Sequence, residues 1–171
     1  MEFAIFFGLG VALLLIGLST WRPPREPLPA ARRRIAPTVS VRDMPALVEA
    51  LESSGSEGSF VVVMFSVTGE PANEDFVNLQ YSIEGGLPGL DWVLLAPVNV
   101  ESKAAVVDFL QESGRPVEER VMNGVHYLRT IGPDLGPLGQ ELLAAVFGTG
   151  LDQSIELVLE EVEWRFPRPP H

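Results

Sequence analysis

The first twenty-one residues place the strongest constraint on this chain. From Phe3 to Trp21 the sequence contains nineteen residues and no charge. At about 1.5 Å per residue, a helix of this length approaches the roughly 30 Å thickness of the hydrocarbon core of a bilayer. Residues 1–21 are therefore predicted to form a single transmembrane anchor, and the rest of the chain is predicted to fold at a membrane surface.

The flanks of this run favour a retained anchor over a cleaved secretory signal. Such a signal has a positively charged start, a shorter apolar core and a small-residue cleavage site. Here Glu2 is the only charged residue before the run, and Trp21 leads directly into Arg-Pro-Pro. Within the run, Gly8 and Ala12 have the small-xxx-small spacing that lets a partner helix approach closely. Glycine is also common in transmembrane helices generally, so both interpretations of this pair stay open.

Basic residues follow the anchor and predict its orientation. They are Arg22, Arg25, Arg32, Arg33 and Arg34. Positive residues beside a membrane span remain in the cytoplasm, so the N-terminus is expected outside and the C-terminal domain on the cytoplasmic side of the inner or plasma membrane. The same arginines suit anionic lipid headgroups, at about 1 kcal/mol for each basic residue near the surface. Membrane lipid and other integral membrane proteins are therefore the expected partners of this region.

Residues 22–40 are rich in proline as well as arginine and show no apolar period. Proline favours extended polyproline conformations, so this stretch is predicted to be a semi-rigid linker. A proline-rich ligand for an aromatic groove on a partner is the alternative.

The charge is divided unevenly between the two parts of the chain. The net charge is -11; residues 1–40 carry five arginines against two glutamates, which leaves -14 for residues 41–171. An acidic domain argues against nucleic acid as a partner, because nucleic acid requires a basic binding face. The sequence has no cysteine, which excludes disulfides, thiolate chemistry and cysteine-ligated metal sites.

Residues 41–166 are predicted to form one α+β domain, because apolar residues recur there at both helical and strand spacing. The expected elements are, in chain order, a helix over 44–54 capped by Asp43, a buried central strand over 60–65, a half-buried strand over 76–83, a five-residue loop over 85–89, a strand over 90–96, a helix capped by Asn99 and ending before Gly114, strands over 117–122 and 125–131, and a helix from Asp134 to Gly148. Asn123-Gly124 is the strongest hairpin signal, since a type I′ turn needs positive φ at both positions.

The last element, residues 154–166, fits two structures. As a strand it places alternate apolar residues on one face, but it needs a bulge at Glu160-Glu161. As a helix it leaves Leu157 and Trp164 off the apolar stripe. We favour the strand, because β-branched and aromatic residues dominate its apolar set. Residues 167–171 are expected to be a disordered tail.

The resulting order is α-β-β-β-α-β-β-α-β, which predicts an antiparallel sheet with helices on one side. From about Asp43 to Phe147 this order resembles that of the class I type III secretion chaperones and of the sensory-regulator domains that share their fold. The resemblance rests on element order without a shared motif, and neither the membrane span nor the ninth element belongs to that pattern. It implies a domain that binds proteins rather than one that catalyses a reaction, by analogy of fold alone.

Polar residues on two neighbouring predicted strands form the candidate binding site. They are Asn78, Gln80, Ser82, Asp91 and Trp92. One interpretation is an exposed sheet face that recognises a partner, with Trp92 as its anchor, because tryptophan is enriched in binding hot spots. The alternative places Trp92 in the core and leaves the polar side chains facing water.

The remaining candidate residues do not match the pattern of a catalytic, metal-binding or phosphate-binding site. His126 and His171 lack a second histidine at metal-ligand spacing and a neighbouring nucleophile. The acidic turn with Glu70, Glu74 and Asp75 lacks the spacing of a calcium-binding loop. The glycines before and within the last predicted helix, Gly132, Gly136 and Gly139, match no phosphate-binding motif. No catalytic residue, metal ligand or cofactor is predicted.

The sequence therefore predicts a single-pass accessory subunit whose acidic cytoplasmic domain binds partner proteins of a membrane complex. Two alternatives remain open. A membrane-tethered enzyme would use carboxylates such as Asp91 and Glu101 in a deep pocket. A small-ligand sensor domain would need an apolar cavity between sheet and helices.

Overall fold

A computed structural model describes residues 39–67, 76–122 and 124–163. Its elements are, in chain order, β1 (Val39–Ser40), the 3-10 helix η1 (Val41–Asp43), α2 (Met44–Ser54), β2 (Phe60–Ser66), β3 (Phe76–Glu84), β4 (Leu87–Val93), α3 (Pro97–Glu101), α4 (Lys103–Glu112), β5 (Glu118–Met122), β6 (Val125–Ile131), α5 (Leu135–Phe147) and β7 (Ser154–Glu160). The predicted anchor, the linker arginines, the acidic turn over 69–75 and the tail lie outside these ranges. No helix within them has the length and apolar character to cross a membrane.

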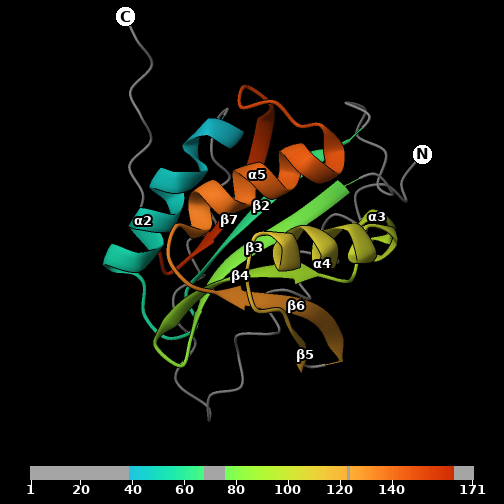
Figure 1. Cartoon of the computed structure of the whole chain (residues 1–171). Coiled ribbons are helices and arrows are strands. Elements are labelled where there is room, and N and C mark those ends of the chain that lie inside the picture. Colours follow the sequence, from blue (N-terminus) through green and yellow to red (C-terminus); the bar gives the residue numbers. More distant parts are fainter. Residues whose placement is uncertain (1–38, 68–75, 123, 164–171) are drawn as a thin grey trace, which may run out of the picture.

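The strands form one antiparallel sheet with the order β1-β7-β2-β3-β4-β6-β5. Helices α2, α4 and α5 lie on one side of this sheet (Figure 1). An α+β domain with helices on one side of an antiparallel sheet is the predicted class, and the structure confirms it. The predicted central position of β2 is also confirmed, because β2 pairs with β7 on one side and β3 on the other.

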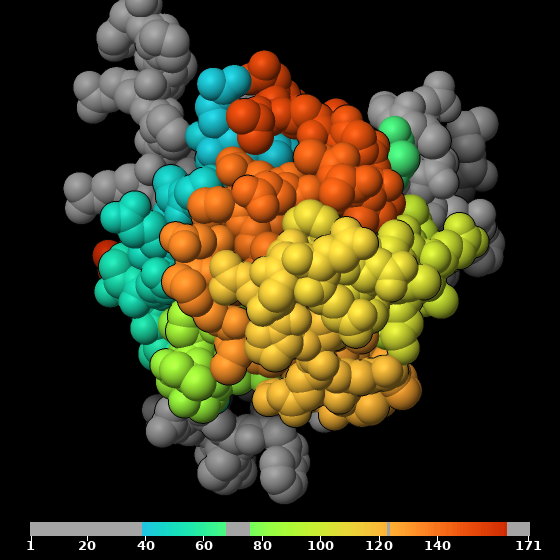
Figure 2. All heavy atoms as spheres, in the orientation of Figure 1, coloured from blue at the N-terminus to red at the C-terminus, as the bar shows by residue number. Residues whose placement is uncertain are grey.

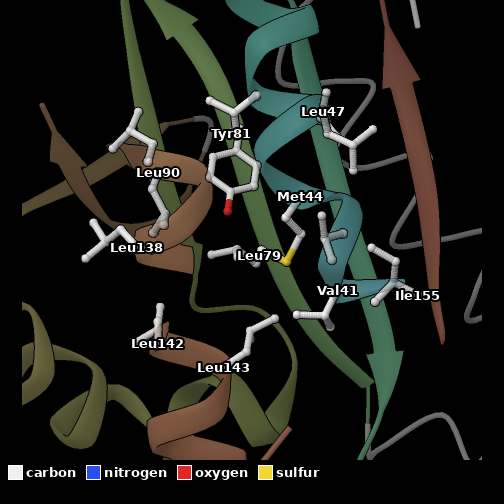
Figure 3. Close-up of a cluster of buried hydrophobic side chains, with 14 of the residues drawn as sticks. Val41, Met44, Leu47, Leu79, Tyr81, Leu90, Leu138, Leu142, Leu143 and Ile155 are labelled. Atoms are coloured by element: carbon white, nitrogen blue, oxygen red, sulfur yellow. The ribbon is translucent and has the colours of Figure 1, made fainter. Parts of the chain in front are cut away.

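The main core lies between the sheet and the helices. Helix α5 packs against both α2 and α4, and the three together cover this side of the molecule (Figure 2). Tyr81 of β3 extends into the core between Met44 of α2 and Leu138 of α5 (Figure 3). Two glycines permit this packing: a Cβ atom on Gly136 would collide with the backbone of α2, and one on Gly139 would overlap the Tyr81 hydroxyl. The glycines of α5 therefore serve close helix packing.

The turn between β3 and β4 is shorter than predicted. We expected a five-residue loop over 85–89, but Leu87 already begins β4 and opposes Glu84. Only Gly85 and Gly86 form the turn, with φ of 61° and 74°. Two successive positive φ angles are the requirement of a type I′ hairpin, so the two glycines set the register of these strands. Strand β3 is buried on both faces rather than half-buried, since Asn78 and Ser82 are also buried.

Asn99 is not the helix cap that the sequence suggested. It lies within α3, whose N-cap is Ala96, and α4 begins separately at Lys103. Its side chain is fully buried and connects three elements. The Asn99 Nδ2 atom donates to the carbonyl oxygens of Asn78 (2.6 Å) and Val93 (2.8 Å), while its Oδ1 atom accepts the Asn78 N–H (3.1 Å). Asn99 therefore holds α3 on the ends of β3 and β4.

The final element is a strand, and the helical alternative for it is wrong. Strand β7 covers Ser154–Glu160 and lies between β1 and β2. It ends where the bulge was expected, because Glu161 adopts a left-handed conformation with φ of 53°. Strand β1, in the stretch assigned to the linker, pairs Val39 with Ile155 and forms one edge of the sheet.

Candidate partner-binding face

The side of the sheet opposite the helices carries a second apolar cluster. Its buried members are Phe60, Val62, Val93, Val125 and Val158, and Met64 and Leu95 pack against them. All of these residues come from strands or from the turn after β4. In the ranges that the structure describes, no helix contributes a side chain to this cluster. We call this side of the sheet the helix-free face.

A buried ion pair lies beside the apolar cluster on the same face. Asp91 of β4 and Arg129 of β6 are opposite each other in the ladder, and their side chains are only 1% and 2% exposed. Arg129 Nη1 donates to Asp91 Oδ1 at 2.7 Å and to Ser82 Oγ at 2.8 Å. The Ser82 hydroxyl in turn donates to Asp91 Oδ2 at 2.5 Å. The three side chains form a closed network across β3, β4 and β6.

The Arg129 guanidinium is also held by backbone atoms. Its Nη2 atom donates to the carbonyl oxygens of Leu87 (3.1 Å) and Ser82 (3.4 Å). Gly89 makes room for it, because a Cβ atom there would overlap the guanidinium group. A buried ion pair is retained only when its remaining hydrogen-bonding groups are satisfied, and these contacts satisfy most of them.

Burial controls the protonation of Asp91. The pKa of Asp91 rises from 3.8 to about 6, because loss of solvation by burial outweighs the attraction of Arg129 and the Ser82 hydrogen bond. The nearby Glu84 carboxylate raises it further. Asp91 therefore keeps its proton to a higher pH than an exposed aspartate does.

Glu84 connects the ion pair to the sheet edge at β5. Its carboxylate accepts a hydrogen bond from Arg120 Nη1 at 3.1 Å and lies 3.7 Å from Arg129 Nε. The Tyr127 hydroxyl donates to it at 3.3 Å. Burial and the negative charge of Glu84 raise the pKa of Tyr127 to about 12, so this hydroxyl remains a donor. The helix-free face thus has an apolar half centred on β7 and β2, which extends to Val93 of β4 and Val125 of β6. Its ionic half is formed by the Glu84, Asp91, Arg129 and Arg120 side chains of β3, β4, β6 and β5.

One buried acceptor on this face has no partner. The Oδ1 atom of Asn78, whose residue is 4% exposed, makes no hydrogen bond within the described part of the chain. Asn78 opposes Met64, a member of the apolar cluster. A buried carbonyl without a hydrogen bond costs about 1–3 kcal/mol, which a donor from another segment or molecule would recover.

The structure brings together four of the five predicted binding residues. Asn78, Gln80 and Ser82 are every second residue of β3, so all three lie on the helix-free face. Asp91 of β4 is directly opposite Gln80. Of the two interpretations of Trp92, the structure supports the one that places it in the core, although Asn78, Ser82 and Asp91 are buried rather than facing water. Adjacent strand residues point to opposite sides of a sheet, so Trp92 lies in the helix-side core. There its ring stacks on Phe147 and its Nε1 atom donates to the Asn99 carbonyl at 3.0 Å.

Sequence reasoning missed Arg129 and Glu84, which form the ionic half of the face. A signal for Arg129 was present, because it shares the face of Val125 and Tyr127 in an otherwise apolar alternation. A charged residue at such a position needs a buried partner. Which residue supplies that partner depends on the pairing of β6 with β4, and local sequence does not specify that pairing.

The remaining candidate groups do not combine into a chemical site. His126 is exposed and lies 3.8 Å from Glu119, which is also bound by Lys103. Glu101 is exposed at the end of α3, whereas both oxygens of Asp91 are occupied by Arg129 and Ser82. Within the described ranges, no group of three potential metal-ligating residues is present.

Comparisons with protein-family models, curated proteins and solved structures give no match to this chain. The resemblance in element order to secretion chaperones and sensory-regulator domains therefore stays a prediction.

Proposed function

We propose that this protein is a single-pass membrane accessory subunit whose acidic domain binds a partner protein through the helix-free face. The observation that carries the proposal is the composition of that face. It combines an apolar cluster, a charged half and the unpartnered Asn78 acceptor on one side of the sheet. An apolar centre with a polar rim is the usual anatomy of a protein interface.

The sequence supplies the rest of the proposal. Residues 3–21 are long enough to anchor the chain in a bilayer, and the five arginines after them favour a cytoplasmic domain. The negative charge of the domain keeps it away from anionic lipid, so its face remains directed to proteins rather than to the membrane. The surface carboxylates favour a partner with a basic rim.

The test is affinity purification of the full chain from native membranes in mild detergent, with identification of the bound proteins. We expect other membrane proteins to co-purify at stoichiometric yield. A full-length protein that remains a lone monomer at every detergent concentration would contradict the proposal.

A matched pair of charge reversals locates the interface. Glu156 is exposed on the helix-free face, opposite Met64, and Glu52 is exposed on α2. We expect Glu156→Arg to reduce the recovered partner at least fivefold and Glu52→Arg to leave it unchanged. Equal losses in the two variants would place the interface elsewhere.

A further inference from the structure

The helix-free face is buried although it is the outer side of a single sheet. Val62, Val93 and Val158 are 0%, 4% and 5% exposed, and every member of their cluster belongs to the sheet or its connecting turn. Side chains on the outer side of a one-layer sheet face water unless a further layer covers them. The described elements supply that layer only on the helix side. Another segment must therefore cover the helix-free face.

We propose that residues 22–38, the proline- and arginine-rich linker, form this layer by lying across the helix-free face. The inference rests on the proposed function in one respect: with residues 3–21 in the bilayer, the linker is the longest segment outside the described ranges that remains beside the domain. It joins the sheet at Val39 in β1, which pairs with β7 at the sheet edge. Seventeen residues in a polyproline conformation extend about 50 Å, whereas six strand spacings measure about 29 Å.

The charges of the two surfaces are complementary. The helix-free face carries Glu84, Asp91, Glu118, Glu156 and Glu160 against Arg120 and Arg129, as the strand registers show. The linker carries five arginines and only one carboxylate, Glu26. A second copy of this chain would instead place two negatively charged faces against each other. Electrostatics therefore favours the linker over a homodimer.

The linker also matches the apolar half of the face. Its prolines, together with Leu28 and Ile35, can cover Val62 and its neighbours. An arginine side chain or a backbone N–H of the linker can donate to the unpartnered Oδ1 atom of Asn78. The C-terminal tail is less well placed, because the Glu163 N–H donates to Ser54 Oγ and leads the chain to the end of α2. A bound linker would occupy the partner surface until a partner displaces it.

The test uses the absence of cysteine from the chain. Single cysteines are introduced at Gln80, half-buried on the helix-free face, and at Glu52, exposed on α2. The rate of thiol alkylation is measured on the purified full chain in detergent micelles without a partner. We expect the cysteine at 80 to react at least tenfold more slowly than the cysteine at 52. Changing Arg32, Arg33 and Arg34 to glutamate should accelerate only the cysteine at 80, at least threefold.

Four results would overturn the inference. Equal rates for the two cysteines would show an open face. If position 80 stays protected after the linker charges are reversed, a different segment covers the face. The same conclusion follows if reversing Arg165 and Arg168, near the C-terminus, removes the protection. Loss of protection on dilution would indicate a second copy. Circular dichroism of each variant confirms that it is folded, and because no partner is present, these outcomes do not depend on whether membrane partners are found.

Discussion

The ionisation of Asp91 links its burial to the pH dependence of the stability of the domain. Its pKa is about 6 in the folded protein against an ordinary value of 3.8, so between these pH values the folded state holds a proton that the unfolded state has released. The contribution of Asp91 to stability therefore falls as pH rises from about 4 to about 6. A shift of this size corresponds to roughly 3 kcal/mol at most.

Chemical denaturation of the full chain at a series of pH values measures this dependence. Asp91→Asn removes the titrating group, so its stability profile should lack the fall that the wild-type protein shows between about pH 4 and 6. Parallel profiles for the two proteins would mean that Asp91 ionises at its ordinary pKa.

The close approach of Gly139 to Tyr81 can be tested by measuring how substitutions at the two positions change the free energy of unfolding. A Cβ atom at position 139 would overlap the Tyr81 hydroxyl, so Gly139→Ala should destabilise the domain by about 1–3 kcal/mol, although alanine favours helix formation. The Tyr81 hydroxyl has no hydrogen-bond partner among the described residues. Tyr81→Phe should therefore be neutral or stabilising by about 1 kcal/mol.

The double variant tests whether the two effects share one cause. In the Tyr81→Phe background, Gly139→Ala should cost at least about 1 kcal/mol less than in the wild-type protein, a positive coupling in a double-mutant cycle. Additive effects in urea denaturation would show that the alanine methyl collides with something other than the hydroxyl.

At the scale of elements, Asn99 decides how α3 is attached to the sheet. Asn99→Ala would leave the Asn78 N–H and the carbonyl oxygens of Asn78 and Val93 without their present partner. Because unmade buried hydrogen bonds cost about 1–3 kcal/mol each, we expect a total loss of about 3 kcal/mol or more in the free energy of unfolding.

Val100 provides the control, since it is the next residue of α3 and is 52% exposed. Val100→Ala should change stability by less than about 0.5 kcal/mol. If the two variants unfold at the same denaturant concentration, the buried amide network does not hold α3 in place.

Elements with strong local signals were predictable from the sequence. The pattern of α2, the apolar run of β2 and the Asn123-Gly124 hairpin depend on neighbouring residues, and the structure has all three elements. Asn99 and Arg129 were not predictable, because each acquires its role from strands brought close only by the sheet order. β1 is two residues long and has no pattern of its own; it is defined by pairing with a strand more than a hundred residues away.

For the whole molecule, the proposed orientation makes a simple prediction in cells. Asp152 is exposed at the surface of the domain, and Glu2 precedes the proposed span. A cysteine at position 152 should react with a membrane-impermeant thiol reagent only after permeabilisation, whereas a cysteine at position 2 should react in intact cells. The opposite pattern would reverse the orientation, and the absence of native cysteine keeps the background low.

The position of β7 has a consequence for how the domain folds. The last described strand lies between β1 and β2, so completing the sheet pairs Val39 with Ile155 and Val62 with Val158. Contacts between such distant parts of the chain raise the contact order, and domains of this kind fold in milliseconds to seconds rather than in microseconds. Until β7 joins the sheet, β1 lacks its strand partner and one edge of β2 stays open. The rate at which these distant strands meet therefore sets how long that edge is available for association with other chains.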